Sequence, residues 1–393
     1  MSLLRPGHAP EARAASLAER IASQRSSRTR SGPAVGPDTA MRLSAFWACV
    51  NLISDLVSTL PAGSYRRRTD VREAIEPKPK LIVDPSAEVS PIAWRRQVVM
   101  SWLTRGNAYG LVTSLDQLGW PTGIEIIHPD KVTATRTRGQ LHWRYEGREI
   151  GQWPNGELWH VPAFVVPGQV VGLSPVSYAA ESIGLGLAAE QYGQDFFGDG
   201  GHPSALLSTQ DPVGETEAKV VKERFRRSVA DGGPVVVGMG MKYERVQIDP
   251  AEAQFLETIH ANVATIARFF GVPPEMIGSE SGNSLTYANV EQRWLDFLTS
   301  CLSTWVVRME EALTRLMPRP QFVKLNTDAL IRVNLADRMR AHDIAIRAGI
   351  RSRDDVRKIE DEPPIPDGTG GQYLWPPYRS SPLAEGQEPR GDR

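Results

Sequence analysis

The segment GVPPEMIGSESGNSLT, residues 271–286, separates two strongly amphipathic helices. Apolar residues recur at spacings of three and four before it, over Ala251–Phe270, and after it, over Tyr287–Met317. At 1.5 Å per residue the second helix would be about 45 Å long, more than the width of a small domain. A loop of this length without regular structure is usually functional or disordered, and a simple hinge is the alternative. We therefore expect long helices that span between domains or subunits, joined by a functional loop.

The segments before this helix pair predict an α+β fold. A helix is expected over Arg42–Leu60, and a second begins at the Ser90-Pro91 pair and ends near Arg105. Short runs of β-forming residues follow, separated by turn residues, and predict a meander of antiparallel strands. The expected strands are 109–114, 124–127, 131–137, 141–145 and 157–161.

A long helix and a compact strand–helix–strand unit come next. The helix begins at Ser174-Pro175 and ends near Phe197, although Gly184, Gly186 and Gly193 weaken its interior. These glycines lie within a helix and do not follow a strand, so close approach of another helix explains them better than a dinucleotide-binding loop. The remaining expected elements are strands at 205–208, 235–238, 242–248 and 322–325 and helices at 215–231, 336–348 and 352–360.

The charges nearly cancel, since 45 Lys and Arg stand against 46 Asp and Glu among 393 residues. This balance excludes a protein that coats nucleic acid by bulk attraction. Residues 1–38 hold six arginines and two glutamates, which suggests a flexible basic arm. Residues 250–286 hold four glutamates and one arginine, so this segment is acidic. No apolar run is long enough for a membrane span. Residues 378–393 are expected to be a disordered tail.

The chain offers little for catalysis, so neither a metal nor a cofactor is expected. Its seven histidines are scattered without metal-ligand spacing, and it has no phosphate-binding loop of the ATPase type. Cys49 and Cys301 lie in apolar stretches and are expected to be buried small hydrophobic residues. A hydrolase that uses His128, His160 or His260 with a nearby carboxylate is the alternative.

Several blocks of this sequence, taken in order, resemble the HK97-like portal family of tailed bacteriophages. Each block is weak alone, but six in the same order are specific, and they cover the chain from about residue 40 to residue 377. The blocks are AFWACVNLI at 45–53 with Leu60-Pro61, LTRGNAY at 103–109, IHP at 127–129, GLSP at 172–175, IARFFGVPP at 266–274, NVEQ at 289–292 and the weaker PPIP at 363–366.

The resemblance implies an α+β portal fold that assembles into a ring, usually of twelve subunits, around a channel for double-stranded DNA. It also implies a division of the chain into named parts. These are a wing at 39–172, stem helices at 173–200 and 248–271, a clip at 201–247, a tunnel loop at 272–286, a long wing helix at 287–317 and a wing strand with a small crown at 318–377.

A portal is the head–tail connector vertex of the virion, and the resemblance implies that role in place of an enzymatic one. It implies nucleation of procapsid assembly and passage of DNA during packaging and ejection, with the motor supplied by another protein. The implied partners are further copies of the chain, the major capsid protein, the terminase large subunit and the head–tail adaptor. The implied locations are the portal vertex and, during assembly, the host cytoplasm, with no membrane.

Two sets of residues are expected to carry this role. Acidic and small polar groups let a channel hold DNA without binding it tightly, because each fixed cation on a phosphate adds affinity. The predicted DNA-facing residues of the tunnel loop are Glu275, Ser279, Glu280, Ser281 and Asn283. The predicted docking surface of the clip is Lys222, Arg224, Arg226 and Arg227, for which a solvated helix face is the alternative. A monomeric DNA-binding scaffold led by the basic arm is the last competing hypothesis.

Overall fold

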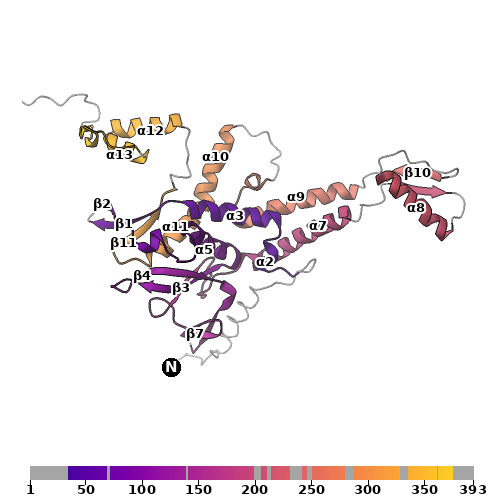
Figure 1. Ribbon diagram of the computed structural model, residues 1–393, viewed down its shortest axis with the longest axis horizontal. Coiled ribbons are helices and arrows are strands. Elements are labelled where there is room, and N and C mark those ends of the chain that lie inside the picture. The colour runs from indigo at the N-terminus through magenta and orange to yellow at the C-terminus, as the bar shows by residue number, and fades with distance from the viewer. Residues whose placement is uncertain are drawn as a thin grey trace, which may run out of the picture. The chain divides into compact units, whose positions relative to one another are not determined.

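The computed structural model describes residues 34–68, 71–138, 140–198, 205–209, 214–230, 241–245, 250–278, 287–327, 335–360 and 362–374. The chain divides into two compact units, residues 1–325 and 326–393 (Figure 1). The larger unit combines helices with antiparallel sheets, which confirms the expected α+β class.

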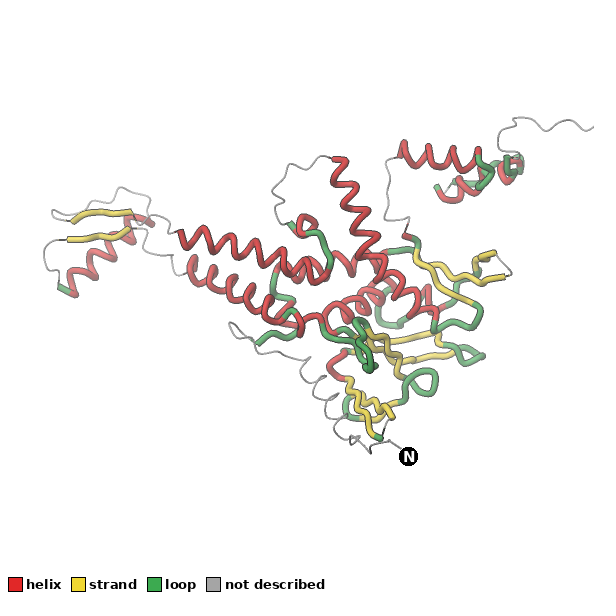
Figure 2. Tube along the Cα trace, turned by 180° about the vertical axis from the view of Figure 1, so that it is seen from behind, coloured by secondary structure: helices red, strands yellow, loops and turns green. Residues whose placement is uncertain are grey.

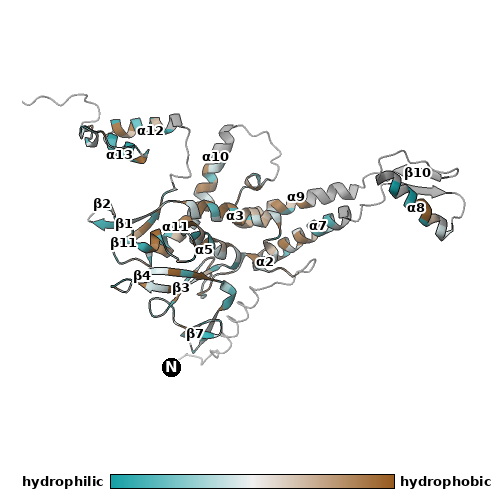
Figure 3. Cartoon of the chain, in the orientation of Figure 1, coloured by the Kyte–Doolittle hydropathy of each residue, from teal (hydrophilic) through white to brown (hydrophobic). Residues whose placement is uncertain are grey.

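Helices α3 (Ser44–Thr59) and α5 (Pro91–Arg105) pack against each other in the core of the larger unit, and both match their predicted bounds. The Ser90 hydroxyl caps α5 by accepting a hydrogen bond from the backbone N–H of Ala93 at 3.3 Å. Gly106, in the left-handed conformation, ends it. Figure 3 shows the hydrophobic colouring along α3. The largest side chains that these helices bury are Phe46, Ile53, Trp94, Trp102 and Leu103.

One antiparallel sheet, in the order β4–β3–β8, packs against α5. Its strands are β3 (Asn107–Leu115), β4 (Pro121–Ile127) and β8 (Leu158–Pro162). Trp94 of α5 stacks on Trp159 of β8 with ring centroids 5.5 Å apart, and its indole N–H donates to the carbonyl of Ile124 at 2.7 Å. The buried indole is therefore both packed and hydrogen-bonded.

A second antiparallel sheet joins β5 (Val132–Thr137), β6 (Gln140–Tyr145) and β7 (Arg148–Ile150). A small apolar cluster, which includes Tyr109 and Trp143, links it to the first sheet. Strand β7 was not expected from the sequence, because three residues are too few to show an alternating pattern.

The third sheet, in the order β11–β1–β2, contains two strands that the sequence analysis did not predict. Strands β1 (Ala62–Arg68) and β2 (Val71–Ala74) form a hairpin, and β11 (Gln321–Leu325), which was predicted, pairs with β1. Arginine-rich strands have no apolar alternation, so the usual signal for a half-buried strand was missing.

The predicted helix 174–197 is present but interrupted at Ala179. It comprises α6 (Pro175–Tyr178) and α7 (Ala180–Gly198), and α7 packs beside α9 (Pro250–Phe270), as Figures 1 and 2 show. Between them along the chain lie β9 (Ala205–Thr209), α8 (Glu215–Ala230) and β10 (Met241–Arg245), with β9 and β10 paired antiparallel. The predicted strand 235–238 lies outside the described residues.

The predicted helix 287–317 is a continuous helical run that ends earlier than expected. It consists of α10 (Tyr287–Phe297), a π-helical stretch (Leu298–Leu302) and α11 (Ser303–Thr314). Pro318 has no N–H to donate to the carbonyl of Thr314, which explains the early end of the helix. Helix α11 packs on β11, and the Thr314 hydroxyl accepts a hydrogen bond from the Val323 N–H at 3.0 Å.

The smaller unit contains the two predicted short helices, α12 (Leu335–Arg347) and α13 (Arg353–Ile359). Ser352 and Asp355 form a reciprocal capping box at the start of α13, with hydrogen bonds of 3.1 and 2.9 Å. Glu360 accepts hydrogen bonds from α12, from Arg338 at 2.9 Å and from the buried His342 at 3.1 Å.

The start of the described chain differs from the flexible arm predicted for residues 1–38. Val35 is buried, a short helix α2 (Pro37–Ala40) follows, and Asp38 pairs with Arg105 at 3.2 Å. One buried valine was too weak a signal within an Arg- and Ser-rich stretch. No helix of the described residues is long and apolar enough to cross a membrane.

Candidate functional site

The start of α6 is fixed to the end of α5 by a buried junction of two glycines and one asparagine. The Asn107 amide donates to the carbonyl of Gly172 at 2.9 Å and accepts from the Gly172 N–H at 2.8 Å. A Cβ on Gly172 would overlap the carbonyl oxygens of Ala163 and Gly106. Ser174 adds a hydrogen bond from its hydroxyl to the carbonyl of Thr104 at 2.9 Å. The junction joins two of the sequence blocks quoted above, LTRGNAY and GLSP.

His160 completes this junction from β8. Its Nε2 lies 3.0 Å from the Asn107 Oδ1, and its ring stacks on Tyr109 with centroids 4.7 Å apart. Burial lowers the pKa of His160 to about 3 because nothing compensates the desolvation of a charged imidazole. His160 is therefore neutral at ordinary pH and has a structural partner in place of the carboxylate that a hydrolase would need.

Helices α7 and α9 approach each other closely at one glycine, as the sequence analysis predicted. A Cβ on Gly186 would lie 2.5 Å from the Oδ1 of Asn262 on α9 and 3.0 Å from Leu43. Asn262 in turn donates its amide to the carbonyl of Ser182 at 2.8 Å. Asn262 is buried, so this polar contact lies within the helix pair.

The base of the loop after α9 is held by three different contacts. Val272 is buried, the Cys301 thiol donates to the carbonyl of Phe270 at 3.1 Å, and Glu275 accepts from Arg293 of α10 at 2.6 Å. Ser279, Glu280, Ser281 and Asn283 lie outside the described residues. Their predicted contact with DNA, and that of Glu275, stays a prediction, and Glu275 already has a cationic partner within the chain.

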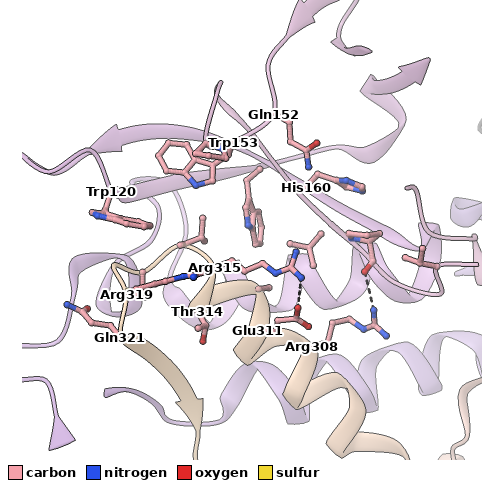
Figure 4. Close-up of a pocket in the computed structure, with 18 residues that line it drawn as sticks. Trp120, Gln152, Trp153, His160, Arg308, Glu311, Thr314, Arg315, Arg319 and Gln321 are labelled. Atoms are coloured by element: carbon pink, nitrogen blue, oxygen red, sulfur yellow. Dashed lines mark hydrogen bonds and ion pairs between the residues drawn. The ribbon is translucent and has the colours of Figure 1, made fainter. Parts of the chain in front are cut away.

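A cavity of about 670 Å³ lies between β8 and α11, as Figure 4 shows. Trp120 and Trp153 line one side of it, and Arg308 and Glu311 of α11, with Arg315 directly after that helix, lie on the other. Trp159 is also among the lining residues. Glu311 pairs with Arg315, and Arg308 donates to the carbonyl of Pro162 at 3.1 Å. Arg308, Glu311 and Arg315 therefore have partners within the chain, and Arg319 also lines the cavity.

Of the remaining chemistry-bearing residues, His128 has a carboxylate beside it, because its Nδ1 lies 3.7 Å from an Asp130 carboxylate oxygen. His128 accepts from the backbone N–H of Asp130 at 3.3 Å, and His260 is exposed on α9. Cys49 and Cys301 are free and buried, as predicted, and burial raises their pKa values to about 12 and about 11. Among the residues that the structure describes, no three His, Cys, Asp or Glu side chains are grouped to hold a metal ion.

The sequence profile of the family described as "Phage portal protein" matches residues 44–361, which is most of the chain and includes every contact of the junction. The chain belongs to the phage portal protein family. Two curated portal proteins are similar along nearly their whole length. The probable portal protein of Streptomyces phage phiC31 is 33% identical over 88% of this chain and 80% of its own length. The portal protein of Enterobacteria phage HK97 is 26% identical over 91% of this chain and 88% of its own.

A solved structure shares the portal fold. A chain from the neck of a native gene transfer agent particle, computed with C12 symmetry, aligns with a TM-score of 0.56 at 18% identity, covering 89% of this chain and 100% of that one. The resemblance to HK97-like portals, drawn from short blocks, is thereby confirmed as family and fold.

The basic residues predicted for the clip surface of this portal protein lie on α8. Arg224 and Arg227 are exposed on that helix, which agrees equally with a docking surface and with a solvated face. The side chains of Lys222 and Arg226 lie outside the description. The sequence analysis missed two sets of residues, the junction around Asn107 and the arginines of the β1–β2 hairpin, because neither has a catalytic or metal-binding pattern.

Proposed function

We propose that this portal protein assembles into a ring of twelve copies at one vertex of the virion, around a channel for double-stranded DNA. The α7–α9 pair carries this proposal, since it is anchored at the start of α6 by the buried Asn107–Gly172 junction and leads directly into the loop at 271–286. The C12 symmetry of the gene transfer agent neck supports the number of copies.

The parts of the chain fit this role as follows. Residues 39–172 would form the wing, α6–α7 and α9 the stem, and residues 201–247 a clip that docks the terminase large subunit and the head–tail adaptor. The long helix at 287–317 would return to the wing, and the segment 318–377 would supply a wing strand and a crown. The structure divides that last segment, with β11 in the larger unit and α12 and α13 in the smaller.

The role proposed is non-enzymatic. The portal would nucleate procapsid assembly in the host cytoplasm by contacting the major capsid protein, and would later pass DNA during packaging and ejection. The loop residues Glu275, Ser279, Glu280, Ser281 and Asn283 would face DNA. The Glu275–Arg293 pair supports a loop base that is close to neutral, which suits a conduit that does not retain phosphates.

Negative-stain electron microscopy of the purified chain tests the ring directly. We expect closed rings with twelve-fold symmetry and a central channel. Monomers or dimers at all protein concentrations would overturn the proposal and favour the hydrolase or the monomeric scaffold.

A loop replacement tests the channel assignment separately from the ring. Residues 279–286 are replaced by a Gly/Ser segment of equal length, which leaves the Glu275–Arg293 pair in place. We expect normal rings but loss of nuclease-protected DNA from capsids. Arg293→Gln, which breaks the Glu275–Arg293 pair from α10, is the control for loop-base stability, and it should package nearly as well as wild type. Normal packaging by the loop replacement would refute the assignment of this loop to the channel.

A further inference from the structure

The β1–β2 hairpin concentrates positive charge that has no carboxylate partner in the described structure. Arg66, Arg67, Arg68 and Arg72 are all exposed, and Glu73 is the one described acidic residue on the two strands. No carboxylate in the described part of the chain pairs with Arg66, Arg67 or Arg68. Four guanidinium groups within seven residues therefore face solvent.

Several arginines elsewhere in the larger unit have acidic partners. Arg96 pairs with Asp55 at 2.8 Å, Arg105 with Asp130 at 3.0 Å and Arg148 with Glu157 at 3.3 Å. The β5–β6–β7 sheet and the turns beside it are the closest comparison, because three ion pairs lie there: Lys131 with Glu146, His142 with Glu149 and Arg148 with Glu157. In the hairpin, Glu73 lies across from Arg66 without an ion pair between them in the described structure, and Arg67, Arg68 and Arg72 have no carboxylate across from them.

The strand register places like charges opposite each other in the hairpin. Arg67 lies directly across from Arg72, an arrangement that destabilises an antiparallel pair. The Arg72 guanidinium lies over the ring of Tyr65, 4.4 Å from its centroid, which holds this cation at the surface. The repulsion between Arg67 and Arg72 is reduced when an external anion lies between their guanidinium groups.

The arginines project from both faces of the ribbon. Side chains alternate along a strand, so Arg66 and Arg68 share one face, about 6.6 Å apart along the strand, while Arg67 and Arg72 share the other. A flat acidic protein surface would engage only one face at a time. Strand β11 pairs with β1 only as far as Arg66, so Arg67, Arg68 and Arg72 lie on a part of the hairpin that is two-stranded. A groove of duplex DNA has a phosphate backbone on each side, and the major groove is wide enough to admit a two-stranded β-ribbon.

We propose that the β1–β2 hairpin binds the phosphate backbones of double-stranded DNA through Arg66, Arg67, Arg68 and Arg72, as a contact separate from the channel loop. The inference rests on the proposed function only in taking DNA as the polyanion that the portal meets. Guanidinium groups suit phosphate because they donate two hydrogen bonds in a planar fork. The portal would thus have a channel that does not bind DNA tightly and a separate surface, the β1–β2 hairpin, that does.

The test uses the full chain and a short fluorescent DNA duplex, with affinity measured by anisotropy over a range of salt concentrations. The variant Arg66→Gln/Arg67→Gln/Arg68→Gln keeps Arg72 on Tyr65 and so spares the hairpin packing. Removal of one cation from a phosphate lowers the slope of log K against log salt by about 0.9, so we expect a decrease of about 2 to 3. Binding at low salt should weaken by roughly tenfold or more.

The matched control is Arg138→Gln/Arg144→Gln/Arg148→Gln, which removes the same charge from the β5–β6–β7 sheet and should leave the slope within about 1 of wild type. An unchanged slope in the hairpin variant, or an equal decrease in the control, overturns the inference. Polyglutamate serves as a second probe, and a larger loss of affinity for polyglutamate than for DNA would assign the hairpin to an acidic protein partner instead. If the hairpin variant forms rings but binds DNA as tightly as wild type, this inference alone is refuted. If the wild-type chain forms no rings, the proposed function is refuted.

Discussion

The Asn107 junction and the base of the 271–286 loop hold neighbouring parts of the same helical framework in different ways. At the junction, buried amide, carbonyl and imidazole groups from β3, β8 and residues 172–174 satisfy one another, with no room for a methyl group at Gly106 or Gly172. The loop base is held by one partly exposed ion pair, one thiol hydrogen bond and the buried Val272. The difference indicates that the helix anchor is held more rigidly than the described base of the loop, residues 271–278.

Gly106→Ala should give the largest loss of stability. Gly106 has φ of +71° and its Cβ would overlap the carbonyl of Leu173, so the variant combines backbone strain with a steric clash. We expect a loss of about 3 to 5 kcal/mol in urea unfolding followed by tryptophan fluorescence. Gly119→Ala is the control, since Gly119 has φ of +82° with open space around it, and it should cost only about 1 kcal/mol. Equal losses in the two variants would show that the junction is not tightly packed.

Asn107→Ala should follow, with a loss of about 2 to 4 kcal/mol. The truncation removes the hydrogen-bond partner of the His160 ring and the side-chain partner of the Gly172 N–H and carbonyl, and the loss of hydrogen bonds in a largely buried site is costly. Urea unfolding measures the effect. Asn155→Ala, in the turn before β8, is a control expected to change stability by less than about 0.5 kcal/mol. A neutral Asn107→Ala would mean that the junction depends on packing alone.

The same junction should make the protein sensitive to acid. His160 has a folded pKa of about 3, well below the ordinary value of 6.5, so the unfolded chain binds a proton that the folded chain refuses. The stability associated with the neutral His160 is therefore fully present above pH 6.5. As the pH falls from 6.5 toward 3, the free energy of unfolding decreases by about 1.4 kcal/mol per pH unit, so that about 2 kcal/mol is lost at pH 5. Unfolding curves at several pH values check this, and His160→Gln should be less stable at pH 7 but flatter between pH 6.5 and pH 4. An equally steep acid dependence in His160→Gln would assign the effect to other groups.

Glu275→Gln should have the smallest effect, below about 1 kcal/mol, because the Arg293 side chain that it pairs with is 41% exposed. The loss should shrink in high salt, which screens the pair in wild type as well. Urea unfolding at low and high salt measures both, and Arg293→Gln should give the same result. A loss as large as that of Asn107→Ala would mean that the loop base is as rigid as the junction.

The helices and most strands could be predicted from the sequence because their signals are local. Ser90-Pro91 fixes the start of α5, and the apolar spacing of α9 ends at Phe270 as predicted. The junction could not be predicted, because Asn107 and Gly172 are 65 positions apart and their roles depend on the fold that brings them together. The hairpin arginines were overlooked for a related reason, since a missing partner is visible only when neighbouring carboxylates are placed. The residues predicted for the tunnel loop and the clip surface remain predictions.

The absence of space at Gly106 and Gly172 has a geometric consequence for the proposed ring. A closed ring requires every subunit to turn the chain through the same angle, because a small deviation is repeated in each copy and accumulates around the circle. Because a Cβ at Gly106 or Gly172 would overlap a neighbouring carbonyl, the backbone at the start of α6 lies directly against the backbone before β3, and this contact restricts the tilt of α6 relative to β3. Gly106 and Gly172 would thus help to keep this angle the same in every copy, as closure of the ring requires.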